Sequence, residues 1–232
     1  MISFIVPAYN EEKYLAPTLE SIHAAANEAG EPYEIVVVDD ASTDATASIA
    51  ERGGARVVTV EKRQIAGTRN AGARASTGDV LIFVDADTQL NGAVVAAALA
   101  ALRAGAVGGG APVRFDRAPR WLNAALFVFI PFYFRLARWA AGCFIFCTRA
   151  AYESAGGFDE TLYASEEIFF SRALKRLGRF VIVGERVTTS ARKAEGRTPF
   201  SMLWMVLRLG AGGLGSVKKR EGAIAFWYPD KR

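Results

Sequence analysis

Three acidic groups combine residue types and positions that suit metal binding and proton transfer. Two of them directly follow strongly apolar runs, and the third stands where a helix is expected to begin. A carboxylate at the end of a buried strand costs free energy unless it has a partner. A hard divalent cation, which takes oxygen ligands and bridges phosphates, is one such partner. The three groups are Asp39-Asp40, Asp85-Ala86-Asp87 and Glu166-Glu167.

The spacing of Asp85 and Asp87 suits a site that holds a cation beside a sugar. Alternate side chains of an extended chain point the same way, so one carboxylate can reach a metal while the other reaches a sugar hydroxyl. A lone Asp-x-Asp often arises by chance, and an acidic pair at a helix start more often complements the helix dipole. The ordered combination of the groups is therefore what indicates a catalytic site.

Alternating strands and helices are expected over the first half of the chain. Its apolar runs lack polar alternation, which indicates strands buried on both faces of a mostly parallel sheet with helices on each side. Ligands bind at the carboxyl ends of such strands, where two of the acidic groups stand. The expected strands are 3–6, 33–38, 56–60, 80–84 and one from 107 onward, and the expected helices are 11–29, one from a Ser42 or Thr43 cap to 52, 67–75 and 91–104.

The second half of the chain is less regular, and the predicted class is α/β with an irregular second half. One or two helices, broken near Pro131, are expected over 118–140. The remaining expected elements are a strand at 143–148, helices at 149–155 and 166–177, and a strand at 180–183 that closes the compact part.

Composition excludes several classes of protein. The 232 residues include 28 Lys and Arg against 24 Asp and Glu, a net charge of +4, with 51% apolar and 22% charged residues. These values are ordinary for a globular fold and exclude a disordered chain, a collagen or a disulfide-built miniprotein. The small basic surplus has no concentrated face, so no nucleic-acid partner is expected.

Neither the cysteines nor the termini indicate an exported or membrane-spanning protein. Cys143 and Cys147 lack the further Cys or His of a zinc site, and we expect both to be core residues on one face of a strand. Met1 leads directly into an apolar run without a basic leader. No run reaches about 18 apolar residues, so no transmembrane helix is expected. We therefore expect a cytoplasmic location.

Five motifs in order resemble the family 2 glycosyltransferases, over about residues 1–190. Members of this family are inverting enzymes with the GT-A fold, which implies a Rossmann-like, mostly parallel sheet flanked by helices with an irregular acceptor-side half. The implied division is a nucleotide-binding half (1–105) and an acceptor-side half (106–190). A basic, aromatic extension (191–232) follows, and its composition suits a membrane surface. The motifs are IVPAYNEEKYLAPTLESI, EIVVVDDASTD, AGTRNAGARASTGDVLIFVDADT, AGGFDE and EEIFFSRALKRLG.

The resemblance implies a nucleotide-sugar site with a metal ion, taken position by position. Asp87, together with Asp85, matches the position that binds Mn2+ or Mg2+ on the diphosphate. Asp40 is the residue expected near the base or ribose. The implied nucleotide-binding residues are Pro7, Ala8, Tyr9, Glu11, Asp39, Asp40, Arg69, Asn70 and Asp85.

The catalytic base is implied to be Glu167. Glu166-Glu167 stands where the family usually has Glu-Asp, and the second member is normally the base. Glutamate is one methylene longer than aspartate, but it can abstract a proton if the backbone lies farther back, because proton transfer needs a heavy-atom distance of about 2.6–3.2 Å. Glu166 is the reserve candidate.

The function implied is metal-dependent, inverting transfer of a sugar from a nucleotide sugar to a hydroxyl or lipid-linked acceptor. UDP-sugars are favoured and GDP-mannose follows, because UDP is the commonest nucleotide in the family. The aromatic run 127–134, flanked by arginines, suits either a buried helix or a headgroup boundary. A peripheral contact at the inner face of the cell membrane is therefore expected as the second possibility.

Two other functions remain open. One is a non-catalytic protein that binds a nucleotide sugar, because Glu166-Glu167 differs from the Glu-Asp pair that is usual in the family. A sugar-phosphate nucleotidyltransferase is disfavoured, since the loop at 7–12 is acidic and lacks glycine. Three other positions have less direct interpretations. We expect His23 to be a packing or surface residue, and Gly108-Gly109-Gly110 to form a tight turn or to let a sugar approach closely. We expect Arg192-Lys193 to form a solvated turn in preference to a phosphate contact.

Overall fold

The computed structural model of the chain describes residues 1–116, 140–163 and 165–193. Its strands are β1 (Ile2–Ala8), β2 (Tyr33–Asp39), β3 (Arg56–Thr59), β4 (Val80–Val84), β5 (Thr88–Gln89), β6 (Ala106–Gly110), β7 (Val113–Phe115), β8 (Phe144–Thr148), β9 (Arg179–Ile182) and β10 (Val187–Thr189). Its helices are α1 (Leu15–Ala29), α2 (Thr46–Arg52), α3 (Ile65–Ala75), α4 (Gly92–Arg103), α6 (Arg149–Ala155), α7 (Glu166–Leu177) and the short 3₁₀ helix η1 (Ala191–Lys193). The predicted α/β class is confirmed.

One seven-stranded sheet, in the order β3-β2-β1-β4-β8-β6-β9, forms the centre of the fold. Strand β8 runs antiparallel to both of its neighbours, and all other neighbours are parallel. The register places Ala8 beside Asp39 and Val84 beside Phe144. The carboxyl ends of β1, β2 and β4 therefore meet the start of β8 at one edge of the sheet, which we call the site edge.

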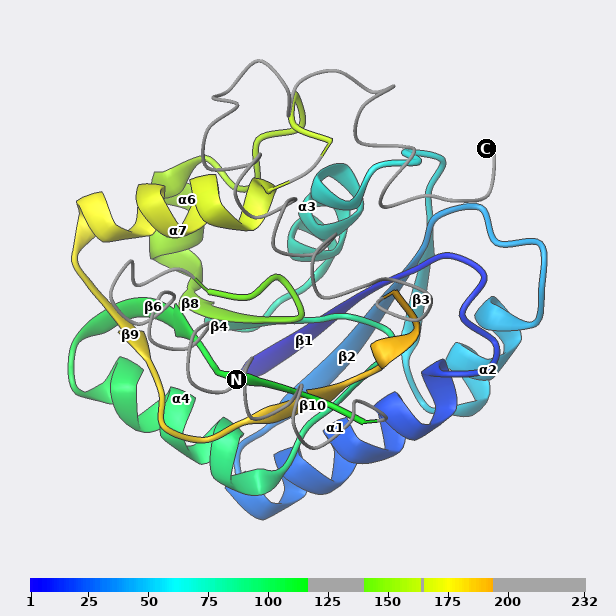
Figure 1. Cartoon of the computed structure of the whole chain (residues 1–232), viewed down its shortest axis with the longest axis horizontal. Coiled ribbons are helices and arrows are strands. Elements are labelled where there is room, and N and C mark those ends of the chain that lie inside the picture. Colours follow the sequence, from blue (N-terminus) through cyan, green and yellow to red (C-terminus); the bar gives the residue numbers. More distant parts are fainter. Residues whose placement is uncertain (117–139, 164, 194–232) are drawn as a thin grey trace, which may run out of the picture.

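Helices cover both faces of this sheet (Figure 1), as the apolar runs predict. Helices α1, α2 and α4 lie on one face and α3, α6 and α7 on the other. In β1, Phe4 and Val6 pack toward α1 and α4, whereas Ile5 packs toward α3 and α7, and all three are fully buried. Burial of alternate side chains in two apolar layers explains why this strand shows no polar alternation.

Helix α1 begins at Leu15, four residues later than predicted. The amides of Tyr14 and Leu15 both donate to the carbonyl of Glu11, which makes a turn of the preceding segment. The Glu11 amide itself donates to Thr46 Oγ1 (2.8 Å). The first residues of the predicted helix thus form part of a loop that is tied to the start of α2.

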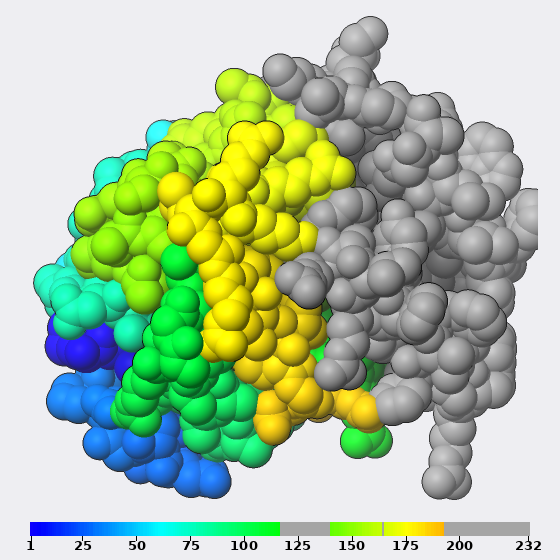
Figure 2. Space-filling view, turned by 90° about the vertical axis from the view of Figure 1, so that its left-hand side faces the viewer, coloured from blue at the N-terminus to red at the C-terminus, as the bar shows by residue number. Residues whose placement is uncertain are grey.

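A second, three-stranded sheet, β5-β10-β7, lies outside the main sheet. Figure 2 shows the chain from α7 through β9, in yellow, passing down this face of the molecule to β10 and η1, in orange. Strands of two or three residues carry no periodic signal, so sequence reasoning did not predict β5 or β10. The expected helices over 118–140, the aromatic run 127–134 and residues 194–232 of the extension lie wholly or largely outside the described residues.

Two sequence expectations for the second half are wrong. Gly108-Gly109-Gly110 is not a turn but part of strand β6, where a Cβ on Gly109 would lie 2.0 Å from the Val181 carbonyl oxygen and 2.5 Å from the Phe146 ring. The two cysteines do not share a face. Cys143 precedes β8 and packs on the α1 and α4 side, whereas Cys147 packs on the other side.

One further expectation, for His23, is confirmed. His23 is a packing residue, whose ring nitrogens lie 2.7 Å from Tyr33 Oη and 2.8 Å from the Gly53 carbonyl oxygen. Across the described ranges, none of the helices combines the length and the apolar character that crossing a bilayer requires.

Candidate active site

The guanidinium of Arg69 joins two of the acidic groups that are far apart in the sequence. Its Nη2 donates to Asp85 Oδ1 (2.9 Å), and its Nη1 donates to Glu166 Oε1 (2.6 Å). Nη2 also donates to the Gly142 carbonyl oxygen (2.8 Å). The arginine side chain is 1% exposed. A single buried cation thus brings the Asp-x-Asp group and the glutamate pair together at the site edge.

Close packing of α3 on the sheet places Arg69 there. A Cβ on Gly72 would lie 2.4 Å from Ile5 Cγ2 and 2.8 Å from Val38 Cγ2, so only glycine allows this approach. The guanidinium also lies over the Phe158 ring, 5.3 Å from its centroid, an arrangement that favours a cation. Helix packing and the aromatic face together fix the direction of the arginine.

Electrostatics keep Arg69 charged. Burial by itself would lower the pKa of Arg69, but the carboxylates of Asp85 and Glu166 raise it above its ordinary value. A buried charge of this kind is tolerated because it is paired and hydrogen-bonded. The same pairing engages one carboxylate oxygen of Glu166 with the arginine. The environment of the Glu167 carboxyl therefore differs from that of Glu166.

The Glu167 carboxyl has a raised pKa. The residue keeps part of its surface open to solvent, but desolvation, followed by repulsion from Glu166, raises the pKa of Glu167 to about 8. A Cβ on Gly142 would lie 3.6 Å from Glu167 Cδ, so the glycine keeps space beside this carboxyl. An acid that titrates near neutral pH is suited to general-base catalysis.

A second cluster surrounds Asp87, and it corrects the expectation that Arg192 lies in a solvated turn. Arg192 Nε lies 3.1 Å from Asp87 Oδ2, and Nη2 donates to Glu11 Oε1. Thr189 Oγ1 donates to Asp87 Oδ1 (3.3 Å). The Arg192 guanidinium also lies over the Tyr14 ring, 4.5 Å from its centroid. Residues from both ends of the described chain therefore meet at the second aspartate of the Asp-x-Asp group.

The donor set at Asp85 and Asp87 fits a cation that is shared with a phosphate ligand. Within residues 1–116, 140–163 and 165–193, no three Cys, His, Asp or Glu side chains come together as a metal site of their own. Mg2+ is usually bound through one or two carboxylates plus substrate phosphates, and Mn2+ accepts the same oxygen ligands. The side chains of Asp85 and Asp87 are 20% and 4% exposed, so both lie at the inner end of the site.

The loops after β1 and β2 bind each other and form one wall of the site edge. The Thr43 amide donates to Asn10 Oδ1 (2.8 Å), and the Asn10 amide donates to Ser42 Oγ (2.9 Å). Asn10 and Ala41 both adopt positive φ angles, 51° and 57°, which is uncommon for residues other than glycine. The predicted nucleotide-binding residues Pro7, Ala8, Tyr9, Glu11, Asp39 and Asp40 lie in or beside these loops.

Asp40 and Asn70 are engaged in holding neighbouring segments. Asp40 Oδ1 accepts the amides of Lys62 and Arg63 (2.7 and 2.9 Å), and its Oδ2 accepts Thr68 Oγ1. Asn70 Nδ2 donates to the Phe158 carbonyl oxygen (2.8 Å), and Asn70 Oδ1 accepts the Phe158 amide (2.9 Å). These contacts give both residues a positioning role: Asp40 for the loop before α3, and Asn70 for the turn before α7.

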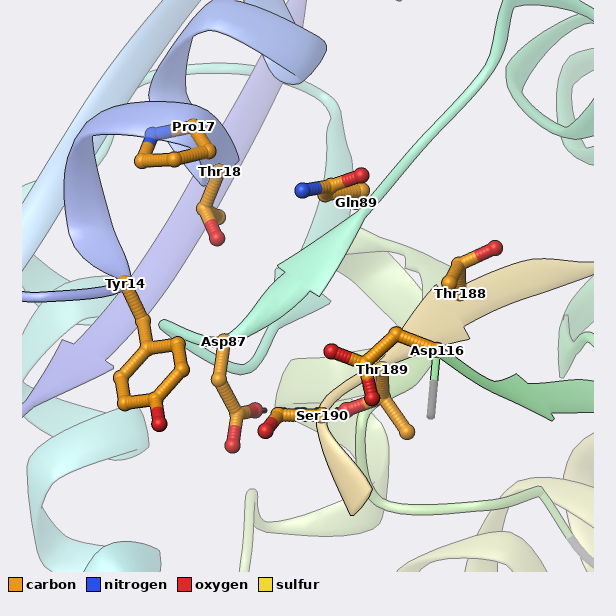
Figure 3. A pocket seen from close by; sticks show the side chains of 9 residues that line it. All are labelled: Tyr14, Pro17, Thr18, Asp87, Gln89, Asp116, Thr188, Thr189 and Ser190. Carbon is orange, nitrogen blue, oxygen red and sulfur yellow. Dashed lines mark hydrogen bonds between the residues drawn. The ribbon is translucent and has the colours of Figure 1, made fainter. Parts of the chain in front are cut away.

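A small cavity lies beside Asp87 (Figure 3). Tyr14 and Asp87 point toward a common space, and Thr189 and Ser190 on the β10 side close it. Neither Arg69 nor Glu166 lines this cavity. It therefore borders the Asp87 cluster only.

Sequence reasoning missed Arg192, Tyr14 and Gly142 as site residues. Gly142 lies near the site because β8 runs antiparallel, which brings its start to the site edge; the Asp85 amide donates to the Cys143 carbonyl oxygen there (3.2 Å). An arginine that follows a strand near the end of the compact part was the only available signal for Arg192. Nothing in the local sequence marks the other two.

Comparison with known proteins gives a family model and several relatives. The model described as "Glycosyl transferase family 2" matches residues 3–155. The undecaprenyl-phosphate 4-deoxy-4-formamido-L-arabinose transferase of Edwardsiella ictaluri (strain 93-146) is 40% identical over 95 residues, which are 38% of this chain and 29% of that relative. The match thus spans less than a third of the relative's length.

Two solved structures are similar over most of this chain. S. aureus TarS 1-349 in complex with UDP-GlcNAc has a TM-score of 0.65 and 21% identity, and the match covers 95% of this chain and 68% of that one. The mannosyltransferase PcManGT from Pyrobaculum calidifontis, in complex with GDP-Man and Mn2+, has a TM-score of 0.62 and 23% identity, with 100% and 65% covered. These likenesses confirm the predicted GT-A fold.

Proposed function

The chain belongs to glycosyltransferase family 2, and from this premise we propose that it transfers a sugar from a nucleotide-sugar donor to a hydroxyl group or to a lipid-linked acceptor. The observation that carries the proposal is the Arg69 guanidinium, which lies 2.9 Å from Asp85 and 2.6 Å from Glu166. The guanidinium thereby joins the Asp-x-Asp group, the candidate metal-binding motif, to the glutamate pair that contains the candidate base. Sugar transfer needs both at once, because the leaving diphosphate and the attacking hydroxyl react in the same step.

The proposed reaction is a single displacement with inversion. When the acceptor is a hydroxyl group, Glu167 takes its proton; a phosphate acceptor attacks through an oxygen that is already ionised and gives up no proton. In either case the acceptor oxygen forms a bond to the anomeric carbon. The bond between that carbon and the diphosphate oxygen breaks, and its electron pair stays on the diphosphate. Attack opposite the leaving group inverts the anomeric centre. A positioned base of this kind typically contributes about 10²–10⁴-fold to the rate. Glu166, held by Arg69, is the positioning residue.

Asp87, with Asp85, is proposed to hold Mn2+ or Mg2+ together with the donor. A bound cation would supply neutralisation of the charge that develops on the leaving diphosphate. We assign this role to the metal because the buried Arg69 guanidinium is already hydrogen-bonded to Asp85 and Glu166 and fixes their positions.

The acceptor and the division of the chain are also proposals. Residues 1–105 would bind the nucleotide and residues 106–190 the acceptor. A lipid-linked acceptor is supported by the name of the Edwardsiella relative, which includes undecaprenyl phosphate, and by the aromatic run 127–134. Such an acceptor would place the protein at the inner face of the cell membrane. UDP-sugars are the first donors to test, and GDP-mannose the next.

A donor panel tests the proposal. Nucleoside diphosphate release is measured from UDP-, GDP- and dTDP-sugars with Mn2+ or Mg2+, with and without EDTA. We expect metal-dependent release from one donor, and loss of that release in Asp87→Asn. Asp79→Asn is the matched control, because Asp79 is 88% exposed and pairs with the N-terminus at the opposite edge of the sheet. Full release in Asp87→Asn contradicts the metal assignment.

The same panel distinguishes a non-catalytic binder, the alternative that the Glu-Glu pair keeps open. Such a protein binds a nucleotide, as measured by calorimetry, but releases no nucleoside diphosphate from any donor even with polyprenyl phosphate or simple alcohols as acceptors. Absence of both binding and release contradicts the proposed function altogether.

A further inference from the structure

Arg192 occupies the carboxylate at which the proposed function places the metal. Its Nε lies 3.1 Å from Asp87 Oδ2, and its Nη2 is hydrogen-bonded to Glu11 Oε1. Asp87 and Glu11 side chains are 4% and 14% exposed, and Arg192 itself is 26% exposed. The Tyr14 ring lies 4.5 Å from the guanidinium carbon. The arginine is thus a well-packed part of the site.

The second sheet fixes this position of Arg192. Strand β10 pairs with β5, so Thr189 lies beside Thr88, next to the Asp-x-Asp group. The Ser190 amide donates to the Asp87 carbonyl oxygen (3.2 Å), and the Ala191 amide donates to Asp116 Oδ1 (2.9 Å). Figure 3 shows Asp87, Thr189 and Ser190 close together. Hydrogen bonds of the two backbone amides that precede Arg192 therefore hold the arginine beside Asp87.

A guanidinium and a divalent cation compete for the same carboxylate. Arg192 already contacts the Asp87 carboxylate that a cation would draw on, and two positive charges a few ångströms apart repel each other strongly where water is largely excluded. Arg192 has a second partner in Glu11 and a stacking surface in Tyr14. It can therefore leave Asp87 by a small movement of its side chain, without unfolding η1.

We infer that Arg192 makes cation binding at Asp87 depend on the donor's diphosphate. In the free protein the guanidinium neutralises Asp87, so a cation alone binds weakly. A diphosphate adds ligand oxygens for the cation and negative charge that offsets the repulsion, so cation and diphosphate bind together. The inference rests on the proposed function, since it assumes that Asp87 is a metal ligand.

Binding of Mn2+, followed by electron paramagnetic resonance of the free ion, tests the inference without any turnover. The whole chain is titrated with Mn2+ alone and again in the presence of UDP or GDP, whichever the chain binds. We expect Arg192→Gln to bind Mn2+ alone about tenfold more tightly than wild type, within the range by which partners of ligating carboxylates tune metal affinity. We also expect the nucleotide to tighten Mn2+ binding less in Arg192→Gln than in wild type.

Arg103→Gln is the matched control, because it removes the same charge from an exposed arginine that pairs with Glu31 away from the site. Its Mn2+ affinity should equal that of wild type. Arg192→Lys, which keeps the charge without the planar fork, should fall between wild type and Arg192→Gln. Thermal unfolding of each variant shows that it is folded.

The outcomes separate the inference from the proposed function. Equal or weaker Mn2+ affinity in Arg192→Gln overturns the inference, and if Asp87→Asn still abolishes Mn2+ binding with nucleotide, the proposed function stands. Mn2+ binding with nucleotide that is unchanged in Asp87→Asn overturns both. An equal gain in Arg103→Gln also overturns the inference, because the effect would then follow from net charge.

Discussion

At the scale of single residues, the pairing of Arg69 with Glu166 gives the two adjacent glutamates different protonation properties. Its guanidinium pairs with Glu166 at 2.6 Å, whereas Glu167 keeps a raised pKa that burial and the Glu166 charge produce. A carboxylate committed to an arginine is a poor proton acceptor, and one with a pKa near neutral is a good one. The assignment of Glu167 as the proposed base follows from this difference.

The pH dependence of kcat/KM tests this division. Glu167 acts only when ionised, and its pKa is raised to about 8, so kcat/KM should fall as the pH decreases through that region. In Glu166→Gln the repulsion from the neighbouring charge is gone and Glu167 ionises more easily. We therefore expect the acid limb of the profile to move to lower pH, though not to the value of a free glutamate, because burial remains. An unmoved limb contradicts the assignment.

Substitution of Arg69 tests its role in folding. Arg69→Met leaves Asp85 and Glu166 without their buried partner, and removal of one member of a buried ion pair typically costs about 3–5 kcal/mol. We expect urea unfolding to show a loss of this order. Arg74→Met on the same helix is the control, because Arg74 is 60% exposed and lies 3.9 Å from Glu160. Equal stability of the two variants contradicts the account.

At the scale of elements, the close approach of α3 to the sheet is what lets one helix reach both acidic groups. Gly72 is the contact point, where an added Cβ would lie 2.4 Å from Ile5 Cγ2. The helix then presents Arg69 to the site edge and Asn70 to the turn before α7. Displacement of α3 should therefore disturb the site as well as the core.

Gly72→Ala should destabilise the fold. Forcing an extra methyl into a packed core typically costs about 1–3 kcal/mol, which exceeds the gain of up to about 1 kcal/mol from the higher helix propensity of alanine. We expect a lower urea midpoint together with slower nucleoside diphosphate release. Gly184→Ala is the control and should be neutral, because no atom lies within 4 Å of its added Cβ. Unchanged stability in Gly72→Ala contradicts the packing argument.

Sequence reasoning predicted the elements of the main sheet well and the partners of the site residues poorly. The strands of the first half are apolar runs, so their positions in the sequence and the acidic groups that follow two of them were predictable. No local sequence pattern explains the burial of Arg69 on α3, because its carboxylate partners are Asp85, which follows β4, and Glu166 at the start of α7. Arg192 depends on β10, whose three residues carry no periodic signal.

At the scale of the whole molecule, the site is assembled from segments spread along the described chain. The reversed direction of β8 brings Gly142 to the site edge, and the second sheet brings Arg192 back to Glu11, 181 residues earlier. A site of this kind forms only when segments that are distant in the sequence are folded together.

Membrane association of the whole molecule is a proposal that rests on the sequence. The aromatic run 127–134 and the basic, aromatic residues of 191–232 suit an anionic headgroup region. We expect the full chain to float with vesicles that contain anionic lipid and to remain behind with purely zwitterionic vesicles. Absence of the chain from the floated fraction in both cases contradicts a membrane-facing extension.

The most direct test of the central claim is nucleoside diphosphate release by Glu167→Gln at saturating donor and metal. Removal of the base should slow release by about 10²–10⁴-fold relative to wild type, while donor affinity measured by calorimetry stays unchanged. Glu166→Gln, measured in parallel, should retain more activity than Glu167→Gln. Wild-type release by Glu167→Gln, or a greater loss in Glu166→Gln, would contradict the assignment of Glu167 as the base.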